Sequence, residues 1–188
     1  MNPARRRATY DDLRQVPDHM VAEIIDGDLY ATPRPSSPHA FAASGVGRDI
    51  FGPFHRSPGD PDGPGGWWIL FEPELHLGAD VVVPDLAGWR HAQMAKVPNV
   101  AHFTQAPDWT CEIVSPDTGA IDRVRKMRLY AREQIGHVWL IDPLAKTLEV
   151  YRLQSGRWMV ASTHSGDDQV RAEPFEAVEI DLKRWWLE

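Results

Sequence analysis

Residues 109–143 read WTCEIVSPDTGAIDRVRKMRLYAREQIGHVWLIDP, and this stretch is the most informative about the architecture. An apolar strand pattern over 109–114 is followed by a helix pattern from about Thr118 to Gln134. A second strand pattern follows over 137–142. A helical crossover of this length permits a parallel strand pair. The stretch therefore predicts a mixed sheet with a helix packed against it.

Strand signals dominate on both sides of this unit. Asp26-Gly27, between the strand patterns 22–25 and 28–32, is a strong two-residue hairpin signal. A helix is predicted from His39 to about Phe51. Further expected elements are β-rich runs over 67–77 and 81–89, a hairpin of 147–153 with 157–162, a strand within 170–180 and a closing helical turn over 181–186. The fold class is therefore α/β, with a mixed sheet core flanked by helices, an N-terminal hairpin and C-terminal antiparallel strands.

Length and composition limit the classes of protein to consider. The 188 residues suit one domain, expected to span 1–188, and the net charge of 20 − 27 = −7 excludes a protein that coats phosphate backbones generally. The single cysteine, Cys111, excludes a disulfide framework and suits the reducing cytoplasm. No apolar run approaches the length of a membrane span. We expect a cytoplasmic protein with no membrane partner.

Motifs for several common chemistries are missing. The sequence has no GxxxxGK[ST], no GxGxxG opening a helix, no GxSxG and no HExxH. The absence of these motifs therefore argues against a nucleotide-binding protein, a serine hydrolase and a zinc peptidase.

Two acidic residues interrupt apolar strands. Asp85 follows Val81–Pro84, and Glu112 lies inside the strand pattern over 109–114. An ionised carboxylate in such surroundings is costly unless a cation or hydrogen-bond donors compensate it. Alternation places Glu112 on the opposite face from Cys111. The other interpretation is that Asp85 begins a turn and Glu112 faces solvent.

The helix pattern carries Asp122, Lys126 and Tyr130 at i, i+4 and i+8, which puts them on one side. An Asp–Lys pair with this spacing is typical of a solvated helix surface. Periodicity alone therefore predicts that this side faces solvent.

Five motifs in order resemble the Uma2 family (DUF820), restriction-endonuclease-like proteins of the PD-(D/E)xK nuclease superfamily. They are Glu23-Ile24-Ile25-Asp26-Gly27, Val83-Pro84-Asp85, Glu112-Ile113-Val114-Ser115-Pro116, Asp122-Arg123 with Lys126 and Tyr130, and Gly136-His137-Val138-Trp139-Leu140-Ile141-Asp142-Pro143. The resemblance covers residues 10–152.

This resemblance implies a metal-dependent endonuclease that acts on DNA. Asp85 and Glu112 match the positions that hold a divalent metal, with the Ile113 carbonyl as a third ligand. Mg²⁺ suits an all-oxygen site, and Mn²⁺ could substitute. The usual strand lysine is Val114 here, so the resemblance implies that Lys126 replaces it and that its side of the helix faces the cleft, contrary to the periodicity. The alternative is a catalytically inactive interaction or regulatory module that keeps the nuclease fold.

Further candidates are less specific. Glu23 and His39 match family positions, although an edge-strand carboxylate and a local helix-start histidine are the competing interpretations. The remaining additional site candidates are Glu74, Asp122 and Tyr130, and the DNA-backbone candidates are Arg123, Arg125 and Arg128. The C-terminal pair Trp185 and Trp186 is expected to cap the core or to join a homodimer contact.

Overall fold

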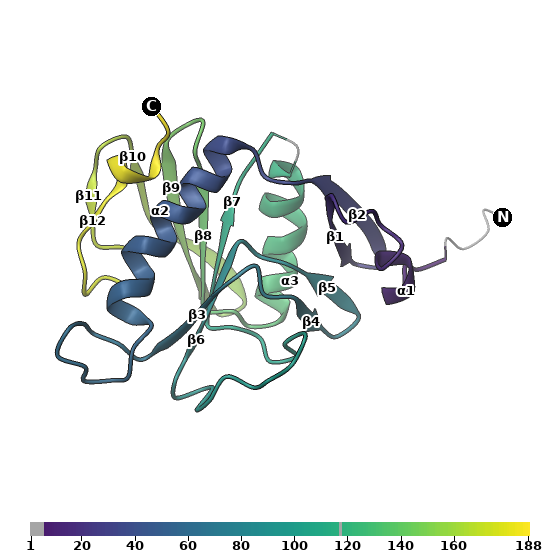
Figure 1. Cartoon of the computed structure of the whole chain (residues 1–188), viewed down its shortest axis with the longest axis horizontal. Helices are drawn as coiled ribbons and strands as arrows, with labels where there is room; N and C mark the ends of the chain where they lie inside the picture. The colour runs from purple at the N-terminus through teal and green to yellow at the C-terminus, as the bar shows by residue number, and fades with distance from the viewer. Residues whose placement is uncertain (1–5, 117) are drawn as a thin grey trace.

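A six-stranded mixed sheet forms the centre of the structure, a computed structural model that describes residues 6–116 and 118–188 (Figure 1). Five residues of the expected 1–188 domain at the N-terminus, and Asp117, lie outside this description. In spatial order the strands are β10 (Arg157–Ser165), β9 (Thr147–Gln154), β8 (His137–Asp142), β7 (Trp109–Ile113), β6 (Leu86–Arg90) and β3 (Trp67–Phe71). β7 and β8 are parallel, and the other neighbours are antiparallel. The predicted parallel pair is confirmed.

A second, four-stranded antiparallel sheet lies beside the first. Its strands are, in order, β2 (Asp28–Pro33), β1 (Met20–Ile25), β5 (Asp80–Val82) and β4 (Leu75–Leu77). Asp26 and Gly27 connect β1 to β2 with φ of 56° and 85°. Both lie in the left-handed region that a tight hairpin turn requires, so the hairpin prediction is confirmed.

The two β-rich runs expected over 67–77 and 81–89 are each divided between the two sheets. β3 and β6 belong to the six-stranded sheet, whereas β4 and β5 belong to the four-stranded sheet. Pro73 and Pro84 lie at the two points of division. Proline lacks the N–H that a continuing strand ladder needs, so the chain changes direction there. Both runs are β-rich as predicted, and their division between two sheets was not predicted.

The helix α2 (Ser37–Phe54) crosses one face of the six-stranded sheet (Figure 1). Its buried side includes Ala42, Val46 and Ile50. The C-terminal segment closes the same apolar layer through β11 (Gln169–Val170), β12 (Ile180–Asp181) and η2 (Leu182–Trp185). Trp185 and Trp186 are 0% and 3% exposed, so they cap the core, which was the first of the two expectations for this pair.

The other face of the sheet is covered by η1 (Ile121–Lys126), a π-helix, and α3 (Met127–Arg132), which continues it. Leu129 packs there with Trp89 and Leu140 of the sheet. The short helix α1 (Tyr10–Leu13) precedes β1. Among the described residues, no helix has both the length and the apolar character needed to span a membrane.

Candidate active site

A cleft of about 630 Å³ lies between the β1–β2 hairpin and the end of the six-stranded sheet at which β7 finishes. Its walls come from β1, the start of α2, Asp85 just before β6, the end of β7, and η1. Many of the side chains that line the cleft are titratable, among them Glu23, His39, Glu72, Glu74, Asp85, Glu112, Asp122 and Lys126. Residues far apart in the sequence therefore meet at one place.

Lys126 lies at the centre of a buried group of charges. Its Nζ atom is 2.9 Å from Glu23 Oε1, 3.0 Å from Glu112 Oε2 and 3.4 Å from Asp122 Oδ1. All four side chains are buried, with Lys126 4% and Glu112 2% exposed. The interpretations that Glu112 and this side of the helix face solvent are therefore wrong.

The buried group carries an excess of negative charge, because three carboxylates surround one ammonium. Burial raises the pKa of Glu23, and raises the pKa of Glu112 well above its usual range, although the Lys126 charge opposes both shifts. For Lys126 itself, burial would lower the pKa, but the carboxylates outweigh it and the pKa lies well above its usual value. The ammonium is thus held charged and the carboxylates compete for it.

Tyr130 completes the environment of Glu112. Its hydroxyl donates to Glu112 Oε1 in a short hydrogen bond, while Lys126 contacts Oε2. Burial and the Glu112 charge raise the pKa of Tyr130 well above its usual value, so the phenol stays protonated and remains a donor. Both oxygens of Glu112 are therefore oriented by side chains of one helix.

The π-helical turn explains why three helix residues reach the same site. In an α-helix, positions four apart drift by about 40°, so Asp122 and Tyr130 would be about 80° apart. A π-turn has about 4.4 residues per turn, which rotates Lys126 back by about 30° relative to Asp122. The α-helical step to Tyr130 then cancels that rotation. Asp122, Lys126 and Tyr130 consequently face the sheet along nearly one line.

Asp85 is positioned by two donors on the opposite wall. His39 Nε2 lies 2.6 Å from its Oδ1 atom, and the Ile113 amide donates to its Oδ2 atom at 2.6 Å. Burial would lower the pKa of His39, but the hydrogen bond and charge of Asp85 outweigh burial, and the pKa is raised. His39 is therefore a contact of the site and is not merely local to its helix. The spacing of the sequence gave no signal for this pairing.

Around Asp85 and Glu112, the described residues do not form a closed set of carboxylate ligands for a metal ion. All four carboxylate oxygens of Asp85 and Glu112 already accept from protein donors, although each oxygen has a further lone pair. Val114, in the usual lysine position, is a buried part of the apolar layer under α3. Within 6–116 and 118–188, three potential ligand side chains converge within 4.8 Å only at Glu74, His76 and His102.

The predicted DNA-backbone arginines lie outside the residues that line the cleft. Arg123 is paired with Glu149 at 2.7 Å, and Arg125 lies 3.7 Å from Asp26. Arg128 lines a separate open groove beside Trp158.

Two arginines that sequence reasoning missed, Arg14 and Arg34, do line the cleft and are exposed. They lie close in sequence to the hairpin motif, but no local pattern distinguishes them from other surface arginines.

Comparison with known proteins identifies a family and a solved structure to which the chain is similar. The model of the Uma2 family, described as "Putative restriction endonuclease", matches residues 7–183. The fold is similar to the crystal structure of a protein from Anabaena variabilis ATCC 29413 described as "a putative nuclease belonging to DUF820". The two chains are 23% identical, with 95% of this chain and 97% of the other covered and a TM-score of 0.69. No curated protein is significantly similar in sequence.

Proposed function

Because this chain belongs to the Uma2 family, we propose that it is a metal-dependent endonuclease that hydrolyses DNA phosphodiester bonds. The observation that carries the proposal is the contact of 3.0 Å between Lys126 and Glu112 in the cleft that Asp85 also lines. Phosphodiester hydrolysis depends mainly on placing charge around the phosphate, which these three groups supply.

Asp85 and Glu112 would hold Mg²⁺, with the Ile113 carbonyl as a further oxygen ligand, and Mn²⁺ could replace it. The donor set supports this assignment, because Mg²⁺ prefers carboxylate and carbonyl oxygens and retains several waters. The excess negative charge around Lys126 supports it too, since a divalent cation would compensate two formal charges. When bound, the ion supplies Lewis-acid polarisation of the phosphate and increases the acidity of the attacking water.

The protein's own residues have separate roles in this proposal. Lys126, in place of the strand lysine, donates to a phosphate oxygen and stabilises developing negative charge. Tyr130 orients the Glu112 carboxylate, and His39 orients Asp85. Glu23 and Asp122 keep the Lys126 ammonium charged and in place.

DNA would enter along the wall that carries Arg14 and Arg34, whose guanidinium groups can contact phosphates on either side of the scissile bond. Arg128 would contact the DNA backbone farther from the scissile bond. Arg123 and Arg125 would do the same after each exchanges its carboxylate partner for a phosphate. The net charge of −7 makes such local basic groups necessary.

Cleavage of supercoiled plasmid with Mg²⁺ or Mn²⁺ tests the function. We expect nicked and linear products, and a loss of at least about 100-fold in rate for Glu112→Gln and for Asp85→Asn. The exposed Glu179→Gln is the matched control and should cleave as the unaltered protein does. Absence of cleavage with both metals, or equal cleavage by Glu112→Gln, would contradict the proposal.

A specific observation favours the second candidate, a catalytically inactive interaction or regulatory module. The Lys126 ammonium already has three carboxylate partners and is almost fully buried, so contact with a substrate phosphate would require it to exchange one of these partners. Val114 supplies no replacement. Calorimetric titration with Mg²⁺, run beside the plasmid assay, separates the candidates: an inactive module shows no turnover in any metal.

The cytoplasmic location and the homodimer belong to the same proposal. The lone cysteine is buried and needs no oxidising compartment. The edge strand β10 exposes Met159 and Val160, which gives a second copy an apolar surface to contact. Light scattering across a range of concentrations tests the dimer, and a constant monomer mass would contradict it.

A further inference from the structure

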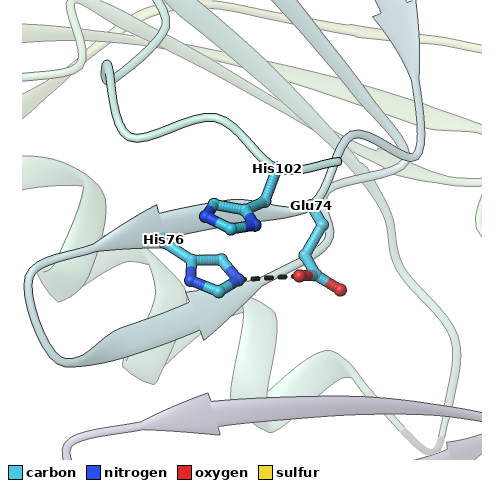
Figure 2. A group of neighbouring side chains, drawn as sticks. All are labelled: Glu74, His76 and His102. Carbon is cyan, nitrogen blue, oxygen red and sulfur yellow. Dashed lines mark hydrogen bonds and ion pairs between the residues drawn. The ribbon is translucent and has the colours of Figure 1, made fainter. Parts of the chain in front are cut away.

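Glu74, His76 and His102 form a second group of potential ligands (Figure 2). Glu74 lies directly before β4, His76 lies in β4, and His102 lies on the loop after β6. The backbone fixes these segments side by side: the Phe103 amide donates to the Glu74 carbonyl at 2.9 Å, and the His76 amide donates to the Phe103 carbonyl at 2.8 Å. The ligand atoms of the three side chains all lie within 4.8 Å of one another. The group is thus preformed by main-chain pairing.

The three side chains also have a supporting shell. Glu74 Oε1 accepts from Tyr10 Oη at 2.9 Å and lies 2.7 Å from His76 Nε2. The His76 and His102 rings are stacked, with centroids 3.7 Å apart and planes 13° from parallel (Figure 2). Rotation of one imidazole about its broad χ2 torsion would direct one nitrogen of His76 and one nitrogen of His102 at the same ion. All three residues are half-buried, which leaves access from solvent.

The donor set differs in kind from that of the Asp85–Glu112 centre. Two imidazoles and one carboxylate prefer borderline cations such as Zn²⁺, Co²⁺ or Ni²⁺, whereas Mg²⁺ prefers oxygen ligands alone. Three protein ligands leave at least one position open to water or to another oxygen ligand. A hydroxyl group that holds the ligating carboxylate, as Tyr10 holds Glu74, is typical of a metal site's outer shell.

We propose that Glu74, His76 and His102 bind one divalent cation of the Zn²⁺ class, at a site separate from the Asp85–Glu112 centre. Glu74 also lines the cleft, so an ion bound there adds positive charge to the cleft wall. This addition would attract phosphate groups in an otherwise acidic protein. The inference does not depend on nuclease activity, because it rests on a different donor set.

Titration of Co²⁺ into metal-free, tag-free protein tests the site, since four- and five-coordinate Co²⁺ gives a visible absorption spectrum. We expect the visible spectrum of one four- or five-coordinate Co²⁺ per chain, which stoichiometric Zn²⁺ abolishes and excess Mg²⁺ does not. His76→Gln and His102→Gln should each weaken binding at least about 10-fold, and Tyr10→Phe should weaken it less. His164→Gln, which removes an imidazole from the distant strand β10, is the matched control and should leave binding unchanged.

Circular dichroism of each variant confirms that it is folded before titration. Glu112→Gln separates the two centres: it should keep the Co²⁺ spectrum whether or not the protein cleaves DNA. Absence of a stoichiometric Co²⁺ spectrum overturns the inference. So does binding that survives in both histidine variants, or binding that Glu112→Gln abolishes.

Discussion

Replacement of Lys126 by methionine should destabilise the protein severely, because it leaves three buried carboxylates without their shared cation. Removal of one partner from a buried ion pair costs about 3–5 kcal/mol. Here one ammonium serves Glu23, Glu112 and Asp122 at 2.9–3.4 Å, so we expect the upper end, about 5 kcal/mol. For a chain of this size, the melting temperature falls by about 2–4 °C per kcal/mol, or about 10–20 °C in total.

The loss should depend on pH in a defined direction. Burial raises the pKa of Glu112 in the folded state, so its contribution to stability is complete below the unfolded value and is lost as pH rises through the folded pKa. Without Lys126 the positive charge that opposes that shift is lost, and the carboxylates take up protons at higher pH. The stability difference between Lys126→Met and the unaltered protein should therefore shrink as pH falls.

Urea denaturation in EDTA, followed by circular dichroism between pH 5 and pH 8, measures both effects. Lys183→Met is the matched control, because Lys183 is 60% exposed and lies 3.8 Å from its carboxylate partner. The control should change the free energy of unfolding by less than about 0.5 kcal/mol. A change within about 1 kcal/mol for Lys126→Met at pH 7, or a loss that grows towards low pH, would refute the reasoning.

Three further predictions concern single side chains. Tyr130→Phe should lower the free energy of unfolding by about 1–3 kcal/mol in urea, because Glu112 loses a buried donor, and an unchanged midpoint would contradict this. His39→Gln should lower stability below pH 6.5 and progressively less above it: the pKa of His39 is raised by Asp85 against burial, so its contribution is lost as pH rises through the folded value. Equal losses at pH 5 and pH 9 would argue against it. Trp185→Ala should cost about 3–5 kcal/mol by calorimetry, and a small loss would show that this side chain does not cap the core.

Local sequence signals predicted much of the fold. The turn chemistry of Asp26-Gly27 specifies the hairpin by itself, and the strand, helix and strand over 109–142 specify the parallel pair. The division of each β-rich run between two sheets was missed, because a hydrophobic run records burial and not which neighbour it pairs with. Pro73 and Pro84 were the available signals for the two changes of direction.

The candidate site was less accessible to sequence reasoning. A helical wheel shows that Asp122, Lys126 and Tyr130 share a side, but it cannot distinguish a polar cleft from bulk water. The family resemblance indicated the cleft, and burial of all three agrees with it. The contact between His39 and Asp85 and the convergence of His102 on His76 join distant segments. Only the folded chain brings such segments together.

The π-turn over Ile121–Lys126 lets the helix carry one extra residue without turning its later side chains away from the site. A π-turn holds one residue more than an α-turn, so deletion of a single residue there would restore a regular α-helix. Tyr130 would then lie seven α-helical steps from Asp122, about 20° away on the same side. A relative lacking that one position could therefore retain the whole sheet and still direct its tyrosine at the acidic centre. The spacing between the aspartate and the lysine would change instead, so a gap of one residue in this segment bears first on where the ammonium lies.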